Sequence, residues 1–137
     1  MKIKLIIYIL LFLSCSTIKN NKSNVKYEKI FYDNGKMQSM SMKINNKLDG
    51  YTKYWDIDGN LVSEAIYFNN ILHGEWKEYS INGKIIHLIN YRYWLKDGSE
   101  LWFYDNGNIK SEQVYKNGEK TQEIIRWDVN GELIFWC

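Results

Sequence analysis

FYDNG, at residues 31–35, occurs again at residues 103–107, an interval of 72 residues. Glycine explains the interval, because glycines recur every 24 residues and 72 is three such steps. The first series comprises Gly35, Gly59, Gly83, Gly107 and Gly131. A second series with the same step comprises Gly50, Gly74 and Gly98, and only Gly118 lies outside both. The chain is therefore predicted to be built from 24-residue repeats.

Aromatic residues form another column with the same period, four positions before each glycine of the first series. This column comprises Phe31, Trp55, Tyr79, Phe103 and Trp127. Asn or Asp directly precedes each of the same glycines. Asn-Gly or Asp-Gly between apolar runs is typical of a β-hairpin turn, since both residues tolerate positive φ. We therefore expect a turn at every glycine of the first series.

The runs between these turns are short and rich in aromatic and aliphatic residues, which is typical of β-strands. One arm is LVSEAIYF at residues 61–68, and YTKYW at residues 51–55 is another. We interpret the second glycine series as the end of longer turns that lead into the next strand. The predicted fold class is all-β, a repetitive antiparallel β-meander of about five hairpin repeats in one domain. The absence of proline suits a continuous ladder.

Charge and composition narrow the function. The chain has 18 Lys and Arg against 16 Asp and Glu, and Lys2 and Lys4 lie in the N-terminal leader. Without these two lysines the charges balance, so the basic surface of a nucleic-acid binder is missing. The aromatic fraction is 16%. We expect aromatic side chains to supply a surface that the repeats share, because one hairpin cannot bury enough apolar area to fold alone.

The first 15 residues, MKIKLIIYILLFLSC, have the layout of a secretory signal peptide. A basic start precedes nine apolar residues from Leu5 to Leu13, too few to span a bilayer, which takes about 20. The ending LSC resembles the lipobox of bacterial lipoproteins, and this resemblance implies cleavage before Cys15 and its lipidation. The alternatives are an ordinary signal peptide and an uncleaved anchor.

These features give an expected organisation of the chain. Residues 1–14 are the signal peptide, residues 15–26 are the lipidated Cys15 and a flexible polar tether, and residues 27–137 are the repeat domain. The expected location is the cell envelope, lipid-anchored at the outer membrane or facing the periplasm, with secretion as the alternative. Cys137 would then be the only free thiol, so no disulfide within the chain is expected.

Two stretches, YDNGNIKSEQVYKNG at residues 104–118 and LHGEWKEYSINGK at residues 72–84, resemble the MORN repeat variant found in many bacterial proteins. The resemblance covers about residues 27–136. Two arms match less well, because KMQSMSMKI at residues 36–44 lacks the usual Glu and KIIHLINYRY at residues 84–93 has His87 and Leu88 in place of Ser-Glu. Many proteins with this repeat are described as antitoxins of toxin–antitoxin systems, which implies a partner-binding role.

Residues that could hold a metal are sparse. His73 shares a turn column with Asp49 and Asp97, and His87 shares a column with serines, with no second ligand expected nearby. DIDGN at residues 56–60 resembles part of a calcium loop but lacks its first and twelfth ligands, so we interpret it as a repeat turn. We expect no metal and no cofactor.

No residue pattern points to catalysis. Glu64 and Glu112 occupy one column, but the meander is expected to separate them by several strands, which is too far for a shared acid–base role. Neither a nucleophile elbow nor a phosphate-binding glycine loop occurs, because the turns account for the glycines. We expect a protein that is not an enzyme.

The function expected from the sequence is binding of a protein partner by the surface of the repeats. The candidate binding residues are Phe31, Trp55, Tyr79, Phe103, Trp127, Phe135 and Trp136. The alternative is a module that binds membrane lipid, which would need a basic cluster on one face. ELIFWC at residues 132–137 is a candidate docking edge for a partner strand or for a second copy, with Cys137 able to join two copies. Closure of the core by Phe135 and Trp136 is the other interpretation.

Overall fold

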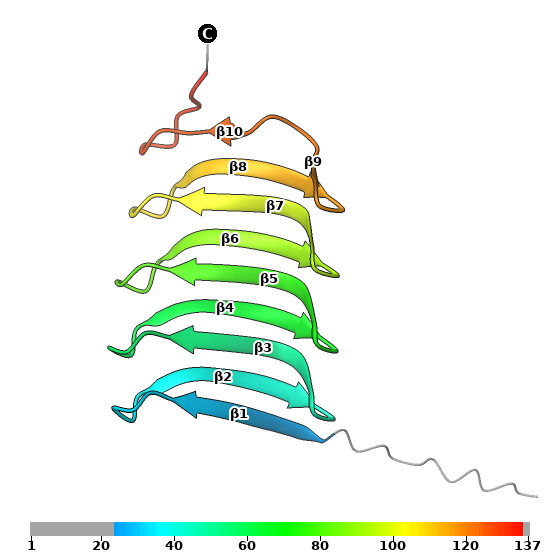
Figure 1. Cartoon of the computed structure of the whole chain (residues 1–137). Helices are drawn as coiled ribbons and strands as arrows, with labels where there is room; N and C mark the ends of the chain where they lie inside the picture. Colours follow the sequence, from blue (N-terminus) through cyan, green and yellow to red (C-terminus); the bar gives the residue numbers. More distant parts are fainter. Residues whose placement is uncertain (1–23, 136–137) are drawn as a thin grey trace, which may run out of the picture.

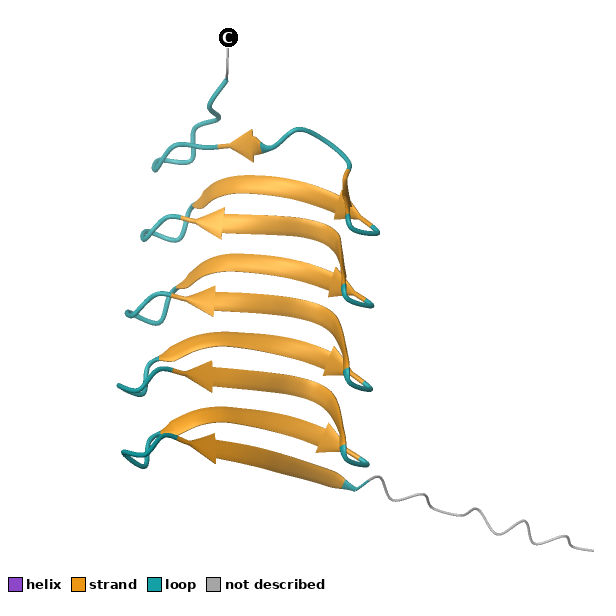
Figure 2. Cartoon of the chain, in the orientation of Figure 1, coloured by secondary structure: helices purple, strands orange, loops and turns teal. Residues whose placement is uncertain are grey.

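The computed structural model describes residues 24–135, and these residues form one antiparallel sheet and no helix (Figure 1, Figure 2). The strands are β1 (Val25–Phe31), β2 (Met37–Ile44), β3 (Lys47–Trp55), β4 (Leu61–Phe68), β5 (Ile71–Tyr79), β6 (Ile85–Arg92), β7 (Leu95–Phe103), β8 (Ile109–Lys116), β9 (Glu119–Lys120) and β10 (Ile125–Arg126). Each of β1 to β8 pairs with the next strand in the chain, and β8 also pairs with β9 and β10. The predicted all-β meander is confirmed.

Strand β1 begins at Val25, two residues before the expected start of the repeat domain. The signal peptide and Cys15 lie outside the described residues, and so do Trp136 and Cys137. None of the segments that the structure describes is a helix long and apolar enough to span a membrane.

Turns at one side of the sheet contain the first glycine series. The N–H of Gly35 donates to the carbonyl oxygen of Tyr32 at 2.9 Å, and Gly59, Gly83, Gly107 and Gly131 each make the same bond three residues back. Only the glycine has positive φ in these turns, and the preceding Asn or Asp does not. The arrangement is typical of a type I turn followed by a left-handed glycine. The predicted turn positions are confirmed.

Two-residue turns at the other side form a series that the glycine spacing does not reveal. Both residues of each turn have positive φ, which is the geometry of a type I′ hairpin. The turns are Asn45-Asn46, Asn69-Asn70, Tyr93-Trp94 and Asn117-Gly118. Gly118 is therefore in register with the repeat, in the column of Asn46, Asn70 and Trp94. Asn tolerates the left-handed conformation, so the column carries glycine only once.

The expected turn role of Gly50, Gly74 and Gly98 is wrong, because these glycines lie inside β3, β5 and β7. The strands curve strongly as they leave the two-residue turns (Figure 1). Gly74 has φ of 133°, and a Cβ there would lie 2.9 Å from Cβ of Ile66. The second series therefore marks bends at which a side chain of the preceding strand packs against the glycine.

The ten buried residues among residues 24–135 all lie on one face of the sheet, which we call the inner face; the opposite face is the outer face. Strand pairing shows this, because Ser41 pairs with Thr52 and Thr52 pairs with Ala65. The ten residues are Ser39, Ser41, Thr52, Ala65, Leu72, His87, Ile89, Glu100, Ser111 and Gln113. Seven of them are polar and none is an aromatic of the Phe, Tyr or Trp type. The Phe, Tyr and Trp side chains of the described residues stay partly or fully exposed, so they supply half-buried contacts between repeats and not a fully buried core.

Candidate binding site

The aromatic column lies at the strand ends beside the glycine turns and is mostly half-buried. Phe31 is exposed, whereas Trp55, Tyr79, Phe103 and Trp127 are of intermediate exposure. The Tyr79 hydroxyl donates to Oε1 of Glu64 at 2.8 Å. Phe135 is 79% exposed, and Trp136 lies outside the described part of the chain. Because this column is part of the repeat framework, aromatic residues outside it that are more exposed are the better candidates for a binding surface.

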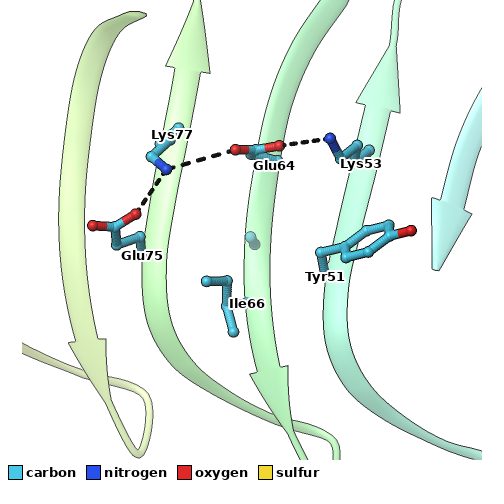
Figure 3. A pocket seen from close by; sticks show the side chains of 7 residues that line it. Tyr51, Lys53, Glu64, Ile66, Glu75 and Lys77 are labelled. Carbon is cyan, nitrogen blue, oxygen red and sulfur yellow. Dashed lines mark ion pairs between the residues drawn. The ribbon is translucent and has the colours of Figure 1, made fainter. Parts of the chain in front are cut away.

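A line of ion pairs crosses the outer face over β3, β4 and β5 (Figure 3). Nζ of Lys53 lies 3.1 Å from Glu64, and Nζ of Lys77 lies 3.7 Å from Glu64 and 2.7 Å from Glu75. These four residues line a cavity of about 300 Å³ together with Tyr51, Ala65 and Ile66. Each charge in the cavity has a partner of opposite sign.

Glu64 and its hydrogen-bond donor Tyr79 each keep one protonation state at neutral pH. Burial acts to raise the pKa of Glu64, but hydrogen bonds from Tyr79 and Lys53 and the charge of Lys77 lower it below the usual value. Burial and the hydrogen bond to Glu64 raise the pKa of Tyr79 to about 12. Glu64 therefore remains a carboxylate and Tyr79 a phenol, which is a fixed charge arrangement. Glu112 lies on β8, with β5, β6 and β7 between it and Glu64, as expected.

Exposed aromatic rings gather where the turn between β6 and β7 approaches β4 and β5. The Tyr93 and His73 rings are 4.8 Å apart, edge to face. Phe68 lies 6.2 Å from His73, and Tyr67 lies 6.1 Å from Trp94. We call these five residues the aromatic corner. Tyr93 and Trp94 are 55% and 56% exposed, so the corner presents large rings to solvent.

A shallow cavity of about 510 Å³ lies against the aromatic corner. Its lining residues are Asp49, Gly50, Ile66, Tyr67, Phe68, His73 and Tyr93. Ile66 also lines the cavity over the ion pairs, so the two cavities adjoin. His73 lies inside β5, and the turn role expected for it is wrong.

The backbone at Tyr93 and Trp94 is in a conformation that bulky residues rarely adopt, with φ of 50° and 71°. A left-handed residue with a Cβ costs roughly 1–2 kcal/mol, and Asn or Gly lowers this cost. The other three turns carry Asn-Asn or Asn-Gly at the same two positions. In the sequence, these turn positions form a third series with a period of 24 residues. YRYW at residues 91–94 is the one member of this series that has no Asn in the turn.

His87 lies on the inner face between two carboxylates, so the expectation of no second ligand-type residue nearby is wrong. Its ring nitrogens lie 3.2 Å from Glu78 and 3.0 Å from Glu100, and its ring stacks on Trp102. Lys96 contacts both oxygens of Glu100 at 2.8 Å. Across residues 24–135, no group of three His, Cys, Asp or Glu residues could hold a metal ion. This cluster is a network of hydrogen-bonded side chains in which Lys96 pairs with Glu100.

The DIDGN stretch forms a repeat turn, as expected. The carboxylate of Asp56 accepts hydrogen bonds from the N–H groups of Asp58 and Asn60 at 3.0 and 2.8 Å. The side chain of Asn60 adds a third bond at 2.9 Å. These bonds lower the pKa of Asp56, chiefly through Asn60. The carboxylate stabilises its own turn.

The fold and the site define a class of protein: a single-layer β-repeat sheet with an exposed aromatic surface. Three segments of the chain, residues 25–42, 72–93 and 96–117, match the family described as MORN repeat variant. That family is generally a non-catalytic binding repeat. The last two segments cover all but the first residue of β5 and β7, all of β6 and β8, and the first residue of the turns at Tyr93-Trp94 and Asn117-Gly118. No curated protein and no solved structure shows significant similarity to the chain.

Proposed function

We propose that this chain is a non-catalytic module that binds a protein partner through the aromatic corner and is anchored in the cell envelope by a lipid on Cys15. The exposed, left-handed Tyr93-Trp94 turn is the observation that carries the binding role. The antitoxin role implied by the family resemblance is one form of this function, with a toxin as the partner.

Two physical arguments support the corner. Strained backbone is retained where the surrounding structure or a function requires it, and the equivalent turns show that this sheet folds with Asn or Gly at these positions. Trp and Tyr are also the residues that most often dominate binding energy at protein interfaces. A strained turn that presents both of them to solvent is best explained by contact with a partner.

Charge favours a protein over a membrane as the ligand. Lipid recognition would need several unpaired basic residues on one face. On the outer face beside the corner, Lys53 and Lys77 are already paired with Glu64 and Glu75. Membrane-lipid binding is therefore the alternative that the experiment must separate.

The test replaces Tyr93 by Asn and Trp94 by Gly, which copies the Asn117-Gly118 turn. The double variant should unfold at a higher temperature, because it relieves strain of about 2 kcal/mol or more. It should also capture its partner from its own cells at least tenfold less efficiently than wild type, measured by quantitative mass spectrometry on the full chain. Loss of binding with a gain in stability is a result that a merely structural turn cannot give.

Asn70→Gly is the matched control, because it makes the same Asn-Gly turn one repeat earlier without removing an aromatic ring. It should leave capture unchanged. Equal capture by wild type and the double variant would overturn the proposal. Flotation with anionic phospholipid vesicles that is lost in the double variant, with no captured protein, would favour the lipid alternative.

A further inference from the structure

The repeat contains an ion pair that is absent at the aromatic corner. Nζ of Lys116, at the end of β8, lies 3.2 Å from Oδ1 of Asp97, near the start of β7. Asp97 and Lys116 are 19 residues apart. Two repeats earlier, the same columns hold Asp49 and Phe68. Phe68 therefore stands where a lysine would neutralise Asp49.

The side chain of Asp49 has no partner elsewhere in the described chain. Its carboxylate makes no hydrogen bond and no ion pair with any residue among 24–135. Arg92 holds the Lys116 column in the intervening repeat, and it does not pair with Asp49 either. The carboxylate of Asp49 is left uncompensated, although it lines the cavity at the corner.

The surroundings of Asp49 are those of a site for a cation. Tyr67, Phe68 and Tyr93 line the same cavity, and the negative face of an aromatic ring attracts a cation. Nδ1 of His73 is buried and has no hydrogen-bond partner in the described part of the chain. In the adjoining cavity every charge is paired, so Asp49 is the unbalanced carboxylate of the combined surface.

We infer that the cavity at the aromatic corner binds an arginine side chain of the protein partner, with its guanidinium against the rings and paired with Asp49. The inference rests on the proposed protein-binding function and names the chemistry of the partner. The partner supplies to Asp49 the positive charge that Lys116 supplies to Asp97. Arginine suits the site better than lysine, because its planar group stacks on aromatic faces and bonds a carboxylate through two N–H groups.

The experiment uses acetyl-arginine-amide as the probe and acetyl-citrulline-amide, its uncharged isostere, as the matched ligand. Binding to the full chain in detergent is followed by the tryptophan fluorescence and by NMR shifts of the aromatic protons. The arginine probe should bind weakly but saturably, and the citrulline probe should bind at least tenfold more weakly, because citrulline lacks the charge.

Three variants test the assignment. Asp49→Asn should weaken arginine binding about tenfold, because the carboxylate partner is lost. Phe68→Lys, which copies the lysine at position 116, should remove binding altogether, because it supplies an internal partner for Asp49. Asp97→Asn is the control and should leave arginine binding unchanged. Circular dichroism of each variant verifies that the sheet is intact, and Phe68→Lys keeps the test decisive if Asp49→Asn does not fold.

Equal binding of arginine and citrulline, or an unchanged affinity in Asp49→Asn, would overturn the inference. If the probe fails while partner capture still depends on Tyr93 and Trp94, the corner binds by apolar contact, so the cation site is wrong and the proposed function stands. If the probe binds but capture does not need Tyr93 and Trp94, the proposed function fails and the cation site stands.

Discussion

At the scale of single residues, the contact between Tyr79 and Glu64 keeps the phenol of Tyr79 protonated and favours the ionised carboxylate of Glu64. The phenol donates to the carboxylate at 2.8 Å, and two lysines hold the same carboxylate from either side. The ordinary pKa of tyrosine is 10.0, and burial and Glu64 raise that of Tyr79 to about 12. The folded chain therefore binds this proton more tightly than the unfolded chain does. The resulting stability is fully present below about pH 10 and is lost as pH rises towards 12.

Tyr79→Phe should lower the free energy of unfolding by about 1 kcal/mol at pH 7, a modest value because both groups are partly exposed to water. The stability difference between wild type and the variant should shrink between pH 10 and pH 12, since wild type loses its advantage as Tyr79 ionises. Urea unfolding at pH 7, 10 and 11.5 measures it. A difference that is the same at all three pH values would contradict the assigned hydrogen bond.

At the scale of strands and turns, two kinds of glycine with the same 24-residue period have different roles. Gly107 lies in a turn, where an added Cβ would meet no atom within 4 Å. Gly74 lies at a strand bend, where an added Cβ would meet Ile66 at 2.9 Å. Both have positive φ, so both substitutions carry backbone strain, but only the bend adds a steric clash.

Gly107→Ala should destabilise the protein by about 1–2 kcal/mol, the cost of a left-handed residue with a side chain. Gly74→Ala should cost about 1–3 kcal/mol more, because the packed Ile66 must also move. Thermal and urea unfolding of both variants measures the order. Gly98→Ala should fall between them, since the nearest atom to its Cβ is 3.3 Å away. A larger loss for Gly107→Ala than for Gly74→Ala would contradict the bend.

At the scale of the whole molecule, the two ends of the sheet are different. All seven residues of β1 are exposed, and three of them are charged, which is common on protected edge strands. At the other end, Leu133 pairs with Trp127 and the N–H of Ile134 donates to Arg126, so the last arm folds back on the chain. Docking through residues 132–137 stays a prediction, because Trp136 and Cys137 lie outside the described residues.

Cys15 precedes the described residues, so its lipidation stays a prediction from the LSC ending of the leader. Growth of the producing cells with labelled palmitate should label the wild-type chain but not Cys15→Ser, because the thiol is the attachment atom. Cys137→Ser is the matched control and should label like wild type. Equal labelling of wild type and Cys15→Ser would contradict the lipid anchor.

The period of the repeat and the first set of turns could be predicted from the sequence. Glycine is the residue that most easily adopts positive φ, so Gly35, Gly107 and their equivalents locate turns without knowledge of any other strand. The two-residue turns could not be predicted from the glycine spacing, since Asn45-Asn46 and Tyr93-Trp94 share a conformation but no residue type. The strands between the turns could also be predicted, from their aromatic and aliphatic composition. Both turns and strands depend on the preferences of residues that are close in sequence.

Only the tertiary structure showed which residues of different strands meet. Gly74 is a bend and not a turn because the pairing of β4 with β5 places Ile66 against it. All the buried residues of this single-layer sheet lie on the inner face, and Ser, Thr and His87 are among them. No periodicity in the sequence specifies which side of the sheet is buried. His73 and Tyr93 contact each other across 20 positions of chain, and Asp49 lies in their cavity. Such contacts depend on strand register, and a preference that acts over a few residues does not determine them.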